Sequence, residues 1–166
     1  MAEKSLLEET LQEDSHQGPF VELKFGPRWT YVSAVRSFMQ NFLAVTFEDK
    51  QKADRISMAV SELVENAVKY SDREHAYIRM QVSNDNSTVQ VLVVNHASEA
   101  MANELKTFME EIRSMEPLEA YMMMMKRSVD DPGRSRLGLA RIRYEARGEI
   151  ESLFGDGRIQ MKAEFS

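Results

Sequence analysis

Residues 58–71 read Met58-Ala-Val-Ser-Glu-Leu-Val-Glu-Asn-Ala-Val-Lys-Tyr-Ser71, and this stretch decides how the rest of the chain is interpreted. Glu62 and Asn66 lie four residues apart, so they occupy one face of a helix one turn apart, and Lys69 continues that face. A carboxylate, a carboxamide and an ammonium group in this arrangement could hold a metal-bound phosphate and activate a hydroxyl group or a water. A separate apolar stripe must face a core; it consists of Ile56, Ala59, Val60, Leu63 and Ala67.

The composition of the chain excludes several classes of protein. The net charge of −6 and a pI of about 5.2 disfavour an electrostatic nucleic-acid binder. The absence of cysteine excludes disulfides, thiolate zinc sites and cysteine nucleophiles. No apolar run approaches the roughly 20 residues that span a bilayer, and the first ten residues carry the wrong charge for a secretory signal. We therefore expect a cytoplasmic protein that binds neither nucleic acid nor membrane.

Hydrophobic periodicity predicts both strands and helices. Strands are expected over residues 20–25, 76–82 and 88–94, and a closing hairpin over 149–154 and 158–165 around Gly155-Asp-Gly157. Helices are expected over 29–46, over 49–71 with Asp49 as a cap, over 98–128 with an interruption at Pro117, and over 137–146. Within the helix over 29–46 we expect Trp29 and Phe38 in the core.

The order of these elements defines the fold class. Strands do not alternate singly with helices, so a doubly wound parallel sheet is disfavoured. We predict an α/β (α+β) two-layer sandwich, in which helices cover one face of a mostly antiparallel mixed sheet. Its central, buried strand would be 88–94. Residues 19–166 would form one domain, preceded by a flexible acidic segment over residues 1–18.

The run from Ser61 to Ser71 resembles the N-box of the histidine-kinase-like (GHKL) ATPases, and more closely that of anti-sigma-factor serine kinases. The resemblance implies the Bergerat-type ATP-binding fold, with Asn66 as a ligand of Mg²⁺ and Glu62 as the base for the attacking hydroxyl. It also implies that Lys69 approaches a phosphate. Phosphoryl transfer needs positioning and charge neutralisation, which these side chains supply. The Glu62 and Asn66 spacing alone would equally suit an exposed polar helix face.

A second box is expected after the central strand, where the family usually has Asp-x-Gly-x-Gly. Here Asn95 takes the place of the aspartate, and Ala97 and Glu99 replace the glycines. The resemblance implies that Asn95 reads adenine, because a carboxamide both accepts and donates hydrogen bonds. The other interpretation is an ordinary residue at the end of a strand.

A third box resembles Gly-x-Gly-Leu-Gly-Leu, whose amides cradle phosphate at a helix N-terminus. Only Leu137-Gly138-Leu139 matches it cleanly, and Arg134, Ser135 and Arg136 stand before it. Arg136 and Gly138 would therefore contact nucleotide, with the loop from Arg134 closing over the phosphates. The arginines would either bind phosphate through paired hydrogen bonds or fill the phosphate site and exclude the nucleotide.

These departures resemble the SiaB-type bacterial protein kinases, which also have an asparagine in the first box and a long helical insert. In this insert Met122–Met125 would fill the core or form a lid, and a partner contact stays open because methionine adapts to irregular surfaces. The resemblance implies an ATP- and Mg²⁺-dependent bacterial regulator, a serine/threonine kinase that acts on a small sigma-antagonist-like protein. The alternative is an inactive module that binds a sigma factor or signalling partner. A homodimer is left open.

Overall fold

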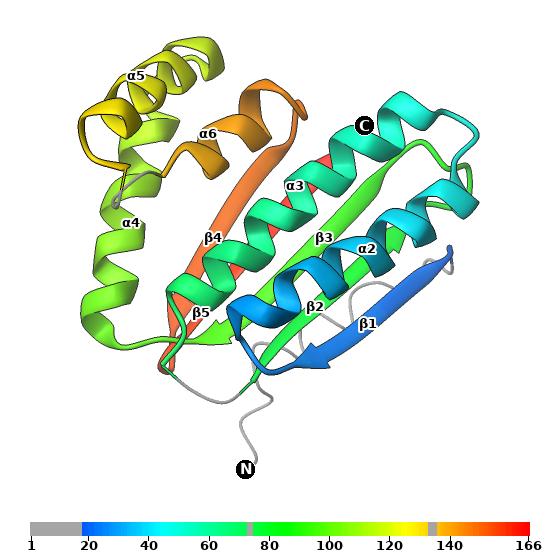
Figure 1. Cartoon of the computed structure of the whole chain (residues 1–166), viewed down its shortest axis with the longest axis horizontal. Coiled ribbons are helices and arrows are strands. Elements are labelled where there is room, and N and C mark those ends of the chain that lie inside the picture. The colour runs from blue at the N-terminus through cyan, green and yellow to red at the C-terminus, as the bar shows by residue number, and fades with distance from the viewer. Residues whose placement is uncertain (1–17, 73–74, 133–135) are drawn as a thin grey trace.

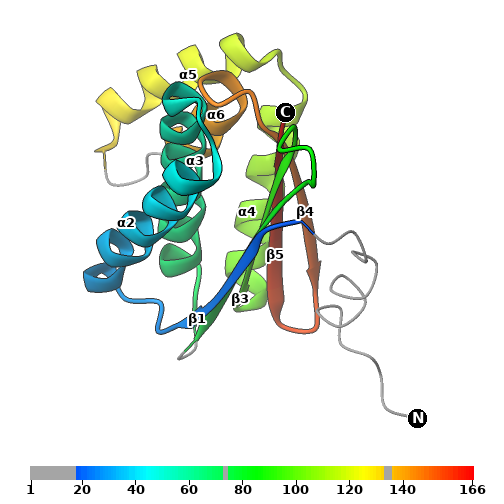
Figure 2. The ribbon, with the colours of Figure 1, turned by 90° about the vertical axis from the view of Figure 1, so that its right-hand side faces the viewer.

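The computed structural model describes residues 18–72, 75–132 and 136–166, and these form two layers (Figure 1). Five strands make one sheet in the order β1-β2-β3-β5-β4. Helices α2 and α3 run side by side across one face of this sheet, and Figure 2 shows both on the same side of the strands. The predicted two-layer α+β sandwich is confirmed. Residues 1–17, including most of the predicted acidic segment, lie outside the described residues.

The strands follow the predicted ranges closely. They span β1 (Phe20–Phe25), β2 (Ala76–Val82), β3 (Val89–His96), β4 (Glu149–Gly155) and β5 (Arg158–Phe165). All four pairings between them are antiparallel. Strand β3 stands in the middle of the sheet, as its unbroken apolar run predicts, and six of its eight residues are buried.

The closing hairpin is found around Gly155-Asp-Gly157 as predicted, but β4 extends to Gly155, so two residues form the turn. Asp156 and Gly157 join β4 to β5, and both have a positive φ, 53° and 69°. A type I′ turn requires this conformation at both central positions, and Asp-Gly supplies it at low cost. The turn therefore fixes the register that places Gly155 opposite Arg158.

The helices are α2 (Trp29–Thr46), α3 (Lys50–Lys69), α4 (Glu99–Arg113), α5 (Pro117–Asp130) and α6 (Leu137–Tyr144). Asp49 caps α3 as predicted, because its side chain accepts a hydrogen bond from the Lys52 amide at 3.1 Å. The long helical region divides at Pro117, which stands in the first turn of α5, where a proline costs no hydrogen bond. Among the described residues, no helix is long and apolar enough to cross a membrane.

Helix α3 forms the centre of the helical layer. Ten of its residues are buried, including all five of the predicted apolar stripe. This burial anchors α3 on the sheet, since each large apolar side chain contributes about 1.5–3 kcal/mol when it leaves water. The polar face of α3 is thereby held at a defined position beside α6, against which α3 packs.

Helix α2 does not bury all the side chains expected in the core. Val32, Val35, Met39 and Leu43 are buried, but Trp29 is 62% exposed and Phe38 is 45% exposed. The prediction for these two residues is therefore wrong. The helix has more apolar side chains than one buried face holds, and these two lie outside the face that packs on the core.

Candidate functional site

The last turns of α3 present Glu62, Asn66 and Lys69, which are all half-buried. The apolar stripe of the same helix is buried in the core, so the backbone that carries the three polar side chains is fixed. Their spacing keeps them on one face of α3, as predicted. The structure therefore supplies a rigid row of a carboxylate, a carboxamide and an ammonium group.

The start of α6 lies directly on the Glu62 carboxylate. A Cβ added at Gly138 would stand 2.1 Å from Glu62 Oε2, so only glycine allows this close approach. One turn further along α6, Arg141 Nη1 donates a hydrogen bond of 2.9 Å to Glu62 Oε1. Two predicted site residues that are 76 positions apart in the chain, Glu62 and Gly138, thus come into contact.

Arg141 also binds a second carboxylate. Its Nε and Nη2 donate to Glu145 Oε2 at 3.3 and 3.2 Å, and the Tyr121 hydroxyl of α5 donates to Glu145 Oε1 at 2.8 Å. The Tyr121 ring stacks on Tyr144 with 4.9 Å between centroids. A chain of polar contacts therefore runs from α5 through Glu145 and Arg141 to Glu62.

Sequence reasoning missed Arg141, Glu145 and Tyr121. The four-residue spacing of Arg141 and Glu145 is a recognisable helical ion-pair signal. Nothing in the sequence shows that Arg141 also reaches Glu62, because that contact depends on how α6 packs against α3.

The two carboxylates bound to Arg141 have pKa values shifted in opposite directions. Burial, and next the charge of Glu65, raise the pKa of Glu62, although Arg141 opposes this. Burial also acts to raise the pKa of Glu145, but hydrogen bonds from Arg141 and Tyr121 outweigh it and hold that pKa below its usual value. Glu62 is therefore the better proton acceptor of the two near neutral pH.

Positive charge gathers where α3 ends. Burial, and next the nearby Arg136 guanidinium, lower the pKa of Lys69. Arg136 itself donates to the Glu104 carboxylate and lies over the Phe108 ring, 5.1 Å from its centroid. The positive charges of Lys69 and Arg136 repel each other. An anion bound near both of them would therefore be stabilised.

Asn95 has a structural contact at the end of β3. It is 3% exposed, and its Nδ2 donates to the backbone oxygens of Tyr70 at 3.0 Å and of His96 at 3.2 Å. These hydrogen bonds join the end of β3 to the end of α3. Asn95 therefore lies at the same end of α3 as Asn66 and Lys69, with its amide nitrogen already engaged.

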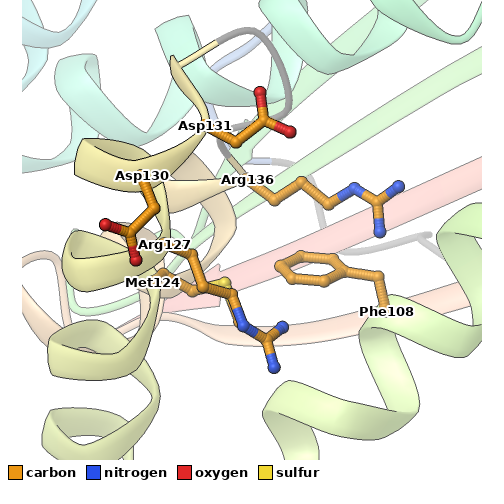
Figure 3. A pocket seen from close by; sticks show the side chains of 6 residues that line it. All are labelled: Phe108, Met124, Arg127, Asp130, Asp131 and Arg136. Atoms are coloured by element: carbon orange, nitrogen blue, oxygen red, sulfur yellow. The ribbon is translucent and has the colours of Figure 1, made fainter.

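A cavity of about 350 Å³ opens between α4, α5 and the residue before α6 (Figure 3). Of the predicted site residues, Arg136 is among its described lining residues, whereas Glu62, Asn66, Lys69 and Asn95 are not. Arg134 and Ser135 lie outside the described residues. The lining combines apolar and charged side chains: Phe108, Met124, Arg127, Asp130, Asp131 and Arg136.

The residues at the end of α3 fit a magnesium-bound triphosphate. A carboxamide oxygen of the kind Asn66 presents is a ligand that Mg²⁺ accepts, and Lys69 with Arg136 supplies charge complementary to phosphate. The Gly138 backbone lies close to the Glu62 carboxylate, so it stands beside this row of polar side chains. The residue types that a magnesium-bound triphosphate needs are therefore present at this end of α3.

Comparison with known proteins assigns the family. The profile of the histidine kinase-like ATPase domain matches residues 25–143, which is more than half of the chain. This chain belongs to the histidine kinase-like ATPase family. The matched range contains α3, β3 and most of α6, so it covers the three boxes that carry the resemblance. No curated protein sequence matches the chain.

Two solved structures share the fold of this histidine kinase-like ATPase domain. A chain of the SiaB-SiaC complex from Pseudomonas aeruginosa matches with a TM-score of 0.65 and 14% identity, over 99% of both chains. The RsbU and RsbW domains of Rv1364c from Mycobacterium tuberculosis match with a TM-score of 0.54 and 16% identity. That match covers 89% of this chain and 32% of the mycobacterial one, so this chain spans about a third of its length.

Proposed function

We propose that this protein is an ATP-binding bacterial regulator that phosphorylates a serine or threonine of a small partner protein. The observation that carries the proposal is the contact of the Glu62 carboxylate with Gly138, one turn from Asn66 on a helix whose last turn brings Lys69 near Arg136. Membership of the histidine kinase-like ATPase family supports ATP as the nucleotide. We also propose that residues 19–166 form one domain, because one core cluster runs from Val32 to Phe165.

The proposal gives each side chain a separate task. ATP supplies the transferred γ-phosphoryl group, and Mg²⁺ neutralises its charge. Asn66 holds the metal through its carboxamide oxygen, while Lys69, Arg136 and the backbone at Gly138 contact phosphate. Asn95 reads adenine through its carboxamide oxygen, since its nitrogen is bound to Tyr70 and His96.

Glu62 takes the proton of the attacking hydroxyl. Its raised pKa favours this task, because a base is most effective when its pKa lies near the working pH. In the structure Glu62 is bound to Arg141, and that contact opposes proton transfer. Glu145 offers Arg141 a second anionic partner, so the guanidinium stays paired when Glu62 is engaged with substrate.

The proposed partner is a small sigma-antagonist-like protein, or alternatively a sigma factor. Two structural neighbours are described with a second protein or domain, RsbU with RsbW and SiaB with SiaC. Helix α5 offers a surface for such a partner, because four exposed apolar side chains repeat along one line of it: Leu118, Met122, Met125 and Val129. ATP as the donor favours a cytoplasmic location.

A partner-binding module without phosphoryl transfer is the second candidate. Four contacts favour it: Arg141 pairs with Glu62, Glu104 and Phe108 each contact Arg136, and the Tyr70 backbone oxygen accepts from the amide of Asn95. In this case α5 binds its partner stoichiometrically and the polar row of α3 has a structural role.

Phosphorylation with labelled ATP tests the proposal. The protein is incubated with γ-labelled ATP, Mg²⁺ and a small sigma-antagonist-like protein, and the label on that protein is measured. We expect Glu62→Gln to bind nucleotide but to transfer label at least about a hundredfold more slowly. Asp54→Asn removes an exposed carboxylate of the same helix that is not among the charges shifting the pKa of Glu62, so it is the matched control and should transfer label normally. Transfer by Glu62→Gln at the wild-type rate would exclude Glu62 as the base.

A further inference from the structure

The sheet has an outer face, opposite the helices, on which two apolar side chains are buried. Figure 2 shows α2 and α3 on one side of the strands. All five described helices contribute buried residues to the core cluster, but Leu92 and Val94 of β3 do not belong to it, although they are only 7% and 5% exposed. Their neighbours Val91 and Val93 do belong to it, so alternation along β3 places Leu92 and Val94 on the outer face.

A largely buried guanidinium lies beside Leu92 on this face. Arg79 of β2 is the cross-strand partner of Leu92, and its side chain is 14% exposed. Its Nη1 donates to Glu22 at 3.1 Å, and its Nη2 donates to Gln81 at 2.8 Å. Within the described ranges, Arg79 Nε is buried and has no acceptor. A buried donor without an acceptor is costly, so this position favours one more acidic group.

The chain reaches this face at Gly18. The Gly18 oxygen accepts a hydrogen bond of 3.1 Å from Gln81 Nε2, and Gln81 points to the outer face because its neighbour Val82 belongs to the core cluster. The Pro19 oxygen accepts from the Val82 amide at 2.8 Å. A Cβ at Gly18 would stand 1.8 Å from the Val82 oxygen, so this glycine lies directly against the end of β2. Residues 1–17 therefore precede a point that is fixed beside the outer face.

The sequence of residues 1–17 has the side chains that this face lacks. Leu7 and Leu11 are four residues apart, so they would share one side of a helix. The segment has one lysine, Lys4, and five carboxylates: Glu3, Glu8, Glu9, Glu13 and Asp14. An apolar line flanked by carboxylates is complementary to two buried apolar side chains beside a guanidinium that lacks an acceptor.

The length of the segment also agrees. Leu92 and Val94 lie two and four residues beyond the position of β3 that pairs with Gln81, which is about 7 and 14 Å along the strand. In a helix, Leu11 and Leu7 would lie about 10 and 16 Å from the same end. The two leucines therefore reach the two buried side chains in order.

We propose that residues 1–17 bind the outer face of the sheet of their own chain, with Leu11 and Leu7 packed on Leu92 and Val94. Acidic side chains of the segment supply the acceptor that the guanidinium beside Leu92 lacks. The segment is then held on the sheet, whereas its composition alone predicts a flexible segment.

Charge directs the segment over β2 and β3 and away from β4. A hollow of about 160 Å³ on the outer side of β4 and β5 is lined by one lysine and three carboxylates: Glu149, Glu151, Lys162 and Glu164. The excess of carboxylates there repels an acidic segment.

A nitroxide attached to the segment tests the proposal by NMR. The chain has no cysteine, so Ser5→Cys gives a single attachment site on the side of the predicted helix opposite Leu7. The nitroxide broadens nearby methyl resonances, and we expect those of Leu92 and Val94 to broaden most. Val45 and Val129, the matched probes on the exposed surfaces of α2 and α5, should stay sharp. Strongest broadening at Val45 or Val129, or equally weak broadening at all these methyl groups, overturns the proposal.

A mixing experiment shows whether the segment binds its own chain. Isotope-enriched protein without nitroxide is mixed with nitroxide-bearing protein that is not enriched. We expect every methyl resonance to stay sharp in the mixture. Broadening at Leu92 and Val94 in the mixture would assign the contact to a second copy and would overturn the proposal.

The full-length double variant Leu7→Ser, Leu11→Ser removes the apolar line and should abolish the nitroxide broadening at Leu92. The methyl shifts of Leu92 should also move, while those of Val93, on the core face of the same strand, should not. Val129→Ser is the matched control, because it removes an exposed apolar side chain of α5 and should leave the broadening unchanged. Broadening that survives in the double variant would show that the leucines do not hold the segment on the sheet.

Discussion

Helices α3 and α5 are held in the fold by different forces. Ten of the 20 residues of α3 are buried, whereas α5 buries two of 14, Ala120 and Met124. Polar links add to this smaller buried contact: Arg127 binds Glu111 of α4 through two hydrogen bonds of 2.9 and 2.6 Å, and Tyr121 binds Glu145. Core burial makes α3 a fixed support, and solvent-accessible polar links leave α5 able to adjust to a partner.

The two helices would serve the two parts of the proposed activity, which are nucleotide binding and partner binding. Three of the residues proposed for the nucleotide site, Glu62, Asn66 and Lys69, lie on α3, where small displacements would be costly. The surface proposed for the partner lies on α5, where four apolar side chains are exposed. Contacts through Arg141 connect the two, because Arg141 reaches Glu62 on α3 and shares Glu145 with Tyr121 of α5.

The largest expected effect comes from truncation in the core under α3. Leu63 is 1% exposed, so Leu63→Ala should lower the free energy of unfolding by about 2–5 kcal/mol. Met122→Ala on α5 is the control, and because Met122 is 59% exposed it should change that free energy by less than about 0.5 kcal/mol. Urea unfolding of the three proteins measures both values. Equal losses for the two variants would contradict the contrast between α3 and α5.

A smaller effect is expected from the tyrosine that ties α5 to Glu145. Tyr121→Phe removes one hydrogen bond to a carboxylate and should cost about 1 kcal/mol. Tyr144→Phe is matched to it, since the two rings stack and the described residues give the Tyr144 hydroxyl no hydrogen bond. It should therefore cost almost nothing. Thermal unfolding compares the two variants. Because both keep their stacked rings, a loss in Tyr121→Phe no larger than that in Tyr144→Phe would show that the hydrogen bond to Glu145 does not stabilise the fold.

Gly138→Ala should act on the site more than on stability. The new Cβ would push the Glu62 carboxylate away from its contact with Arg141, but alanine favours the helix by about 0.5–1 kcal/mol over glycine and offsets part of the cost. We expect a change of less than about 1 kcal/mol in stability and a clear change in the ¹³C shift of the Glu62 carboxyl.

Gly155→Ala is the control for this substitution, because nothing lies within 4 Å of the Cβ it would add. Its Glu62 carboxyl resonance should match that of the wild type. An unchanged resonance in Gly138→Ala as well would mean that Glu62 is not held between Gly138 and Arg141 in solution.

The smallest effects concern pH and should have opposite signs at the two carboxylates. The raised pKa of Glu62 means that its ionised form weakens the fold, so the stability it contributes is present at low pH and is lost as pH rises through its folded-state pKa. The lowered pKa of Glu145 means that its ionised form strengthens the fold, and this stability is lost as pH falls through its folded-state pKa.

Melting temperatures of the wild type and of the two variants, measured between pH 4 and pH 8, test these opposite effects. Carboxylates with shifted pKa values titrate over about this range. Near neutral pH, Glu62→Gln should melt above the wild type and Glu145→Gln below it, and both differences should shrink toward acid pH. A Glu62→Gln variant that melts below the wild type at neutral pH would show that its pairing with Arg141 outweighs its burial.

The sequence predicted elements best where one physical signal dominated. The apolar period of α3, the Asp49 cap, the Pro117 break and the Asp156-Gly157 turn are local signals, and each corresponds to an observed feature. Trp29 and Phe38 were placed wrongly because periodicity shows that a face is apolar but not what covers it. On α2 two apolar stripes compete for one core, and the second stays exposed.

The candidate site was less predictable, because its decisive contacts join distant parts of the chain. The sequence identified Glu62, Asn66, Lys69 and Gly138 from the resemblance of their boxes. It gave no sign that Arg141 would bind Glu62 or that Arg136 would pair with Glu104, since each contact depends on the packing of α6. The assignment of these residues to ATP stays a prediction until nucleotide binding is measured.

The central claim is that the polar row of α3 binds the phosphates of Mg·ATP. Isothermal titration with a non-hydrolysable ATP analogue, with and without Mg²⁺, tests it most directly in the wild type and in Asn66→Ala. The account predicts binding that requires Mg²⁺ and that Asn66→Ala abolishes while its circular dichroism stays unchanged. Affinity that is equal in the folded variant and the wild type, or a folded wild type that binds no analogue, would contradict it.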